Sequence, residues 1–131
     1  MTMMIAEVSE KFNVSQDTLR YYERIGLIPR VNRNKSGIRN YTEEDCKWVH
    51  FIKCMRQRAG LPVEVLIEYV GLFQQGDETF EARKELLIEQ RELLIIKIED
   101  MKKTLEILDD KIARYEQTLL KKEQTLRRSE D

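Results

Sequence analysis

The sequence predicts a mainly α-helical protein in which a small N-terminal domain precedes one long C-terminal helix. From residue 80 to 126 the chain contains no glycine or proline, and apolar residues recur every seven positions. Residues 1–75 instead alternate short apolar-periodic segments with turn residues. Charged residues make up 36% of the 131 residues and aromatic residues only 8%, a composition typical of long helices with little interior.

The first 29 residues predict two short helices joined by a tight turn. Ile5, Val8 and Phe12 share one face of the first helix. Ser15 is a suitable N-cap for the second, which is expected to run to about residue 25 and to end at Gly26. This arrangement is either a helix-turn-helix or an ordinary helical hairpin.

The second helix has an arginine and two tyrosines in succession, "RYY". Tyr22 follows Leu19 at a spacing of three residues, so both can face the core. Arg20 and Tyr21 are then left pointing outward. This exposes a large aromatic ring to water unless the ring contacts a partner.

Residues 30–41, "RVNRNKSGIRNY", hold four cations and no anion. A turn cluster at residues 34–37 separates two short segments that are expected to pair as a β-hairpin. Strand alternation places Arg39 and Tyr41 on one face of it. Beside a helix-turn-helix, such a hairpin (the wing) can reach DNA phosphates, and the alternative is a solvated loop.

Two further helices are expected to complete the N-terminal domain. Thr42 and Asp45 form a capping box for a helix from residue 43 to 58. Pro62 is suited to open the next helix, Gly76 to end it, and Thr79 to cap the last one. The apolar stripe expected on the helix over residues 43–58 is Trp48, Phe51, Ile52 and Met55.

The long helix carries two interleaved apolar series, which indicate a coiled coil. At ~1.5 Å per residue it is roughly 70 Å long, so its seam must find a partner helix, most simply in a second copy of the chain. We therefore expect an N-terminal domain at 1–75, a dimerisation helix at 79–126 and a charged tail at 127–131. The expected seam is Leu94, Ile98, Met101, Leu105, Leu108, Ile112, Tyr115 and Leu119.

The formal net charge of −1 hides an asymmetry. Residues 1–71 hold eleven Lys/Arg and nine Asp/Glu, whereas residues 72–131 hold twelve and fifteen. The local basic charge permits a compact nucleic-acid contact. No apolar segment is long enough to span a membrane and no signal-peptide pattern opens the chain, so we expect a cytoplasmic protein without a membrane partner.

The order of these parts resembles the MerR family of bacterial transcriptional regulators. The motif "TLRYYERIGLI", followed by "R-x-Y" in the wing, two more helices and a long terminal helix, carries the resemblance over essentially the whole chain. The segments "FIKCM", "AGLP", "EVLIEY" and "EARKELL" are similar to the short aldehyde- and thiol-responsive branch, AdhR- and NmlR-like. The resemblance implies a winged helix-turn-helix and an antiparallel pair of terminal helices. This chain departs from the family's usual spacing by one extra residue between Arg56 and Gly60.

The same resemblance implies the residues that contact DNA. The N-terminal end of the second helix would face the major groove, the outward side chains after it and the wing would contact phosphates, and the third helix would extend the contact. Carried onto this sequence, these residues are Ser15, Gln16 and Thr18, then Arg20, Tyr21, Arg39 and Tyr41, and finally Lys53 and Arg56.

Two cysteines lie eight residues apart on the third helix, too far to form a disulfide. Chemistry alone favours an inert thiol at Cys54, whereas the branch resemblance implies a reactive sensor with His50 as a possible helper. Cys46 is taken as structural. Cys46, His50 and Cys54 span too much of the helix to hold one metal ion together, so we expect no metal and no cofactor.

The sequence thus predicts a homodimeric DNA-binding regulator, not an enzyme. By the resemblance it would bind a palindromic operator in a promoter with an over-long spacer and distort it so that RNA polymerase engages both recognition elements. Electrophile modification of Cys54 would switch it. The alternative is a DNA-architectural or scaffolding coiled coil without an effector. A thiol enzyme using Cys54 and His50 lacks a third orienting group and an oxyanion site.

Overall fold

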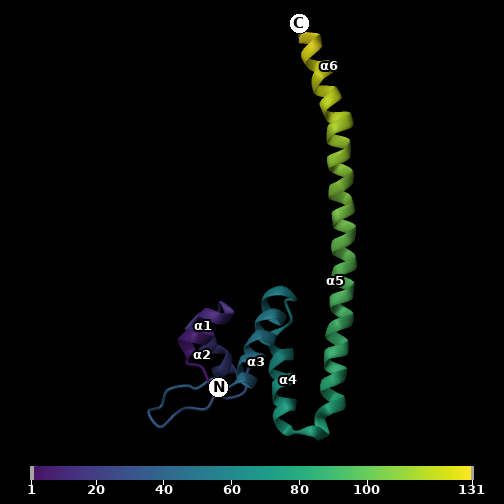
Figure 1. Cartoon of the computed structure of the whole chain (residues 1–131). Coiled ribbons are helices and arrows are strands. Elements are labelled where there is room, and N and C mark those ends of the chain that lie inside the picture. Colours follow the sequence, from purple (N-terminus) through teal and green to yellow (C-terminus); the bar gives the residue numbers. More distant parts are fainter. Residues whose placement is uncertain (1, 131) are drawn as a thin grey trace. The chain divides into compact units, whose positions relative to one another are not determined.

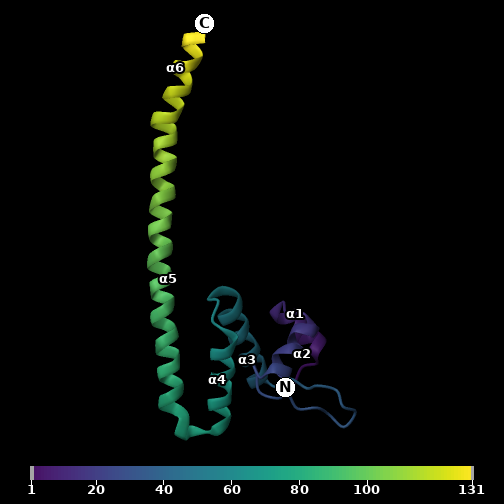
Figure 2. The ribbon, with the colours of Figure 1, turned by 180° about the vertical axis from the view of Figure 1, so that it is seen from behind.

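The computed structural model describes residues 2–130, apart from the side chains of residues 119 and 128–130 (Figures 1 and 2). It has two compact units, an N-terminal unit of residues 1–90 and a C-terminal unit of residues 91–131. None of the described helices is long and apolar enough to cross a membrane. The elements are α1 (Ile5–Phe12), α2 (Gln16–Ile25), α3 (Glu43–Lys53), η1 (Cys54–Arg58), α4 (Val63–Gln75), η2 (Asp77–Thr79), α5 (Phe80–Arg114), η3 (Tyr115–Leu119) and α6 (Leu120–Glu130).

The N-terminal unit has one hydrophobic core, to which the segments from α1 to α4 all contribute. Because residues of one helix face recur every three or four positions, each short helix supplies one or two fully buried side chains. The buried members are Val8, Val14, Leu19, Tyr22, Leu27, Ile28, Val31, Tyr41, Cys46, Val49, Ile52, Leu61 and Leu66.

Helices α1 and α2 confirm the predicted helix-turn-helix. Asn13 ends α1 in the left-handed conformation, with φ of 54°. Ser15 caps α2, its Oγ accepting a hydrogen bond of 3.1 Å from the backbone N–H of Thr18. Gly26, with φ of 85°, ends α2.

The expected β-hairpin of the wing is not confirmed, because the wing forms no regular strand in the described residues. Arg33 and Arg39 make one isolated antiparallel bridge, and Tyr41 makes another with Met3. The Asn34 side chain stabilises the turn, because its Oδ1 accepts hydrogen bonds from the N–H groups of Ser36 and Ile38 at 2.9 and 3.0 Å. Because Tyr41 pairs with Met3, this end of the wing does not extend the ladder between its own two sides.

Helix α3 runs as predicted from Glu43, and its last turn widens into the π-helical turn η1. After Gly26, the N–H of Leu27 donates to the carbonyl of Tyr22, five residues back. After Gly60, the N–H of Leu61 donates to the carbonyl of Met55, six residues back. The end of η1 therefore accommodates one residue more than the end of α2, as a π turn does.

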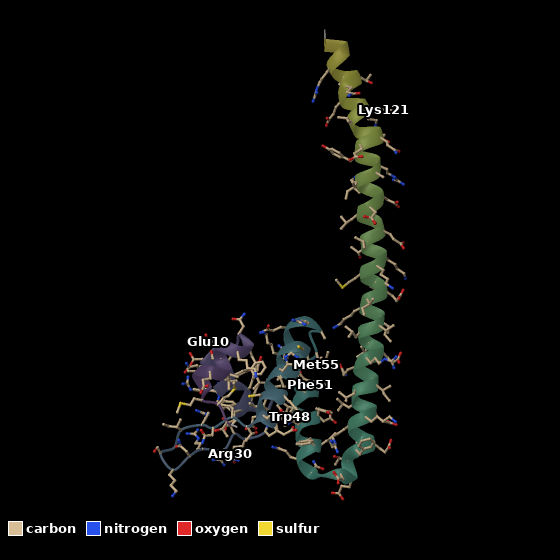
Figure 3. All side chains as sticks on the ribbon, in the orientation of Figure 1. Glu10, Arg30, Trp48, Phe51, Met55 and Lys121 are labelled. Carbon is tan, nitrogen blue, oxygen red and sulfur yellow. The ribbon has the colours of Figure 1, made fainter. Side chains whose placement is uncertain are left out.

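The predicted apolar stripe of α3 is only partly right. Ile52 is buried, but Val49, which the stripe omits, is buried as well. Trp48, Phe51 and Met55 are half-buried and follow one another along α3 and η1 (Figure 3). Because α3 has the core on one side and α4 on the other, two of its faces are apolar.

The half-buried rings of α3 meet rings of α4. Trp48 contacts Tyr69 and Phe73 with centroid separations of 5.8 and 5.0 Å, and Phe51 contacts Tyr69 at 5.7 Å. These tilted and edge-on contacts join the two helices.

Pro62 precedes α4 and Gly76 ends it, as predicted. Thr79 does not act as the expected N-cap of the long helix. Its Oγ1 lies 2.6 Å from the carbonyl oxygen of Leu72 and 2.8 Å from that of Gly76, so it stabilises the end of α4 instead. The carbonyls of a helix end need such a partner.

The C-terminal unit is a helix that exposes its apolar side chains. The helical path of α5, η3 and α6 reaches Glu130, four residues beyond the predicted end. The side chain of the predicted seam residue Leu119 lies outside the described residues, and Leu94 is half-buried. Six other predicted seam residues are between 44% and 72% exposed, namely Ile98, Met101, Leu105, Leu108, Ile112 and Tyr115.

Candidate nucleic-acid interface

The N-terminal end of α2 presents the three residues predicted to face the major groove. The Ser15 hydroxyl caps the helix and donates to Thr18 Oγ1 at 2.8 Å. The Gln16 Oε1 accepts from Arg20 Nη2 at 3.4 Å. These polar atoms lie at the positive end of the helix dipole, where an approaching phosphate is favoured.

Arg20 and Tyr21 point away from the core, as predicted. Arg20 Nη1 forms an ion pair of 2.9 Å with the exposed carboxylate of Asp17. The Tyr21 ring is 41% exposed, and the Arg24 guanidinium lies 5.5 Å from its centroid. One exposed face of α2 thus carries two guanidinium groups and a phenol.

Arg39 lies against α2 instead of projecting freely from the wing. Its Nε is 2.8 Å from Glu23 Oε1, and the two side chains are 21% and 11% exposed. Glu23 Oε2 also accepts from the backbone N–H of Val31, at 3.4 Å. Glu23 therefore joins α2 to both ends of the wing. Glu23 was not among the predicted site residues. Its place four residues after the buried Leu19 and next to the buried Tyr22 is the signal that indicates an inward-facing acid.

Tyr41 does not take the position that the wing prediction gave it. Its side chain is fully buried, and its hydroxyl has no hydrogen-bond partner in the described part of the chain. Burial raises the pKa of the hydroxyl, and the nearby charge of Arg39 offsets only part of this effect. Because the two bridged segments turn this ring inward, we exclude Tyr41 from the DNA-contacting set.

Lys53 and Arg56 hold the ends of neighbouring segments. Lys53 Nζ donates to the carbonyl of Phe12, the last residue of α1. Arg56 Nη1 donates to the carbonyl of Leu61 at 2.6 Å, across the turn that follows η1. Lys53 is placed where a carbonyl at a helix end needs a donor, and Arg56 bonds to the turn between η1 and α4. An ammonium and a guanidinium each carry further N–H donors that a phosphate can accept from.

The two cysteines have different surroundings. Cys46 is buried with its Sγ 3.9 Å from the Met3 sulfur, and burial raises the pKa of its thiol. Cys54 is half-buried at the first position of the π turn, with its Sγ 3.8 Å from His50 Nε2. Cys46 is therefore buried in the core, whereas Cys54 is partly accessible beside His50.

Comparison with known proteins places this arrangement in a family. The family model described as MerR HTH family regulatory protein matches residues 3–71, which include α1, α2, the wing and α3. The chain belongs to the MerR family. It is accordingly a transcriptional regulator and not an enzyme.

Relatives in sequence are regulators of the same family. The chain is 59% identical over 93 residues to the HTH-type transcriptional regulator AdhR of Bacillus subtilis, a match that covers 71% of this chain and 66% of AdhR. It is 31% identical over 116 residues to an HTH-type transcriptional regulator of Haemophilus influenzae, covering 88% of this chain and 85% of that protein.

Two solved structures have the same fold over nearly the whole chain. A MerR family transcriptional regulator from Listeria monocytogenes is 48% identical with a TM-score of 0.89, covering 98% of this chain and 96% of that one. HiNmlR, a MerR family regulator lacking the sensor domain and bound to promoter DNA, is 30% identical with a TM-score of 0.82. That match covers 92% of this chain and 94% of HiNmlR.

Proposed function

We propose that two copies of this chain pair through the long helix, bind an inverted repeat in promoter DNA and change the shape of the spacer between the polymerase recognition elements. The observation that carries the proposal is the face of the N-terminal unit on which α2 presents Arg20 and Tyr21 and Glu23 holds Arg39 against the same helix. Helix-turn-helix proteins bind DNA through such a face, and the similar HiNmlR was solved on promoter DNA.

The pairing follows from the exposed seam. Six apolar side chains at heptad spacing remain between 44% and 72% exposed in one chain. A second long helix would cover them, as in a coiled coil. The resemblance to the family gives the antiparallel direction, which sets two DNA-binding units apart at a fixed spacing. A pair related by a two-fold axis matches an inverted repeat.

The regulatory step is indirect readout. Phosphate contacts from Arg20, Arg39 and the third-helix residues Lys53 and Arg56 position each half-site without reading bases. Holding both half-sites at a spacing that straight DNA does not match favours a bent or untwisted spacer. RNA polymerase then engages both of its elements, which makes it an indirect partner.

The switch is assigned to Cys54. The π turn puts this half-buried thiol where α3 turns toward α4, beside His50. Addition of the thiol sulfur to the carbonyl carbon of an aldehyde moves the thiol proton to the aldehyde oxygen and releases nothing. The added group alters packing at this turn and thereby the angle between the two DNA-binding units.

In vitro transcription tests the proposal. The inverted repeat is located by footprinting upstream of the chain's own gene, and transcription is measured with and without formaldehyde. We expect the wild type and Cys46→Ala to respond to formaldehyde and Cys54→Ala to bind the operator but not to respond. A normal response in Cys54→Ala overturns the switch, and failure of the wild type to bind the repeat overturns the whole proposal.

A further inference from the structure

The joint between α2 and the wing contains a carboxylate whose two oxygens are both used within the chain. Glu23 Oε1 accepts from Arg39 Nε at 2.8 Å, and Oε2 accepts from the Val31 N–H at 3.4 Å. Its side chain is 11% exposed. Removing a carboxylate from water is costly unless it is paired and hydrogen-bonded, and Glu23 meets both conditions.

Within the described residues, the guanidinium of Arg39 makes a hydrogen bond on one edge. Of its five N–H donors, the structure assigns the one on Nε to Glu23, and the four on Nη1 and Nη2 make no hydrogen bond to the described part of the chain. A guanidinium can bind two acceptors at once because its donors form a planar fork. Arg39 can therefore bind Glu23 and a phosphate together.

We infer that Glu23 is a positioning residue for DNA recognition: it ties the wing to α2 and orients the Arg39 guanidinium so that its Nη edge meets a backbone phosphate. This inference rests on the proposed function, since it assumes that α2 and the wing bind DNA. Glu23 touches no DNA in this account and acts only through Arg39 and Val31.

The other arginine pair of α2 shows why Glu23 is singled out. Arg20 and Asp17 are three residues apart on one helix, and the Asp17 side chain is 96% exposed. Such a pair contributes little and joins no separate segments. Glu23 and Arg39 are sixteen residues apart and largely shielded from water, so their bond fixes one segment relative to another.

The pair also changes the electrostatics of the site. With Glu23 ionised, the Arg39–Glu23 pair is neutral, so the phosphate contact depends on geometry more than on net attraction. Glu23→Gln keeps the size of the side chain and removes the charge. The variant leaves the charge of Arg39 uncompensated, which should strengthen binding to DNA of any sequence. It also fixes the orientation of the Arg39 guanidinium less firmly, which should weaken the contact with the operator.

The experiment compares Kd for operator and for random-sequence DNA of the same length at several salt concentrations. Glu23→Gln is expected to lower the ratio of operator to random affinity about tenfold, the size of effect that loss of a charge-assisted hydrogen bond gives. The slope of log affinity against log salt should steepen by about one. Arg39→Lys should lower the same ratio, because an ammonium lacks the second donor edge.

Two controls separate positioning from folding. Glu44→Gln removes an acid from the exposed pair with Lys47, 3.6 Å apart, on α3, and should leave the ratio unchanged. Glu23→Gln with Arg39→Lys should cost little more than either change alone, since both break one contact. Loss of folded protein would lower both affinities in parallel and leave the ratio alone.

The outcomes distinguish the two proposals. If the wild type shows no preference for the inverted repeat, the proposed function fails together with this inference. If the wild type prefers the repeat and Glu23→Gln keeps that preference, or lowers both affinities in parallel, only the role of Glu23 is overturned.

Discussion

The two units of this chain treat their apolar residues in opposite ways. The N-terminal unit covers thirteen apolar side chains in one core, whereas six seam residues of the C-terminal unit are between 44% and 72% exposed. The difference lies in topology: four short helices can surround a common centre, whereas a single helix cannot enclose its own apolar face. The N-terminal unit therefore buries its apolar residues within one chain, whereas the exposed seam of the C-terminal unit is the basis of the proposed pairing with a second copy.

The largest effect is expected from changing the seam. Leu105→Glu together with Leu108→Glu brings like charges into the paired helices and should give monomers. Because two linked half-site contacts bind more tightly than one, operator affinity should fall at least about a hundredfold. Sedimentation and DNA-binding titrations measure the two effects. Lys103 belongs to neither apolar series, so Lys103→Glu serves as the control. A double variant that stays dimeric would contradict pairing through the predicted seam.

A core truncation in the N-terminal unit should act within each chain. Leu19 is fully buried, so Leu19→Ala should lower the free energy of unfolding by about 2–5 kcal/mol. Urea unfolding followed by the fluorescence of Trp48, the one tryptophan, reports on this unit. The matched change Leu105→Ala should weaken dimerisation and leave the Trp48 transition in place. Equal shifts of that transition in both variants would remove the distinction between the units.

The smallest effect concerns two hydroxyls. Ser15 Oγ caps α2, so Ser15→Ala should destabilise the N-terminal unit by about 1 kcal/mol. Thr104 Oγ1 donates a hydrogen bond of 3.1 Å to the carbonyl of Asp100, four residues earlier in the middle of α5. Thr104→Ala should therefore change stability by less than about 0.5 kcal/mol. Chemical denaturation at one protein concentration compares the two, and a larger loss in Thr104→Ala would contradict the assignment.

Local patterns were sufficient for much of the fold. Ser15, Thr42 and Gly26 act through hydrogen bonds and φ angles set within a few residues, so the ends of α2 and the start of α3 could be read from the sequence. The absence of glycine and proline after residue 79 likewise predicted the long helix.

Features that depend on segments far apart could not be read in this way. Tyr41 turns inward because its backbone pairs with Met3. Strand alternation within the wing could not predict a pairing with a segment outside it. Glu23 finds its partner sixteen residues away, and Val49 is buried because α3 has neighbours on two sides. Thr79 bonds backward to Leu72 because η2 brings it beneath the end of α4. The π turn at Cys54 was indicated only indirectly, by the extra residue before Gly60.

The most direct test of the account is the mass of the purified wild-type chain in solution, measured by sedimentation equilibrium over a range of concentrations with and without the inverted-repeat duplex. Pairing through the exposed seam predicts twice the mass of one chain in both cases, and one such pair on each duplex. A single-chain mass at micromolar concentration, or one chain on each duplex, would contradict it.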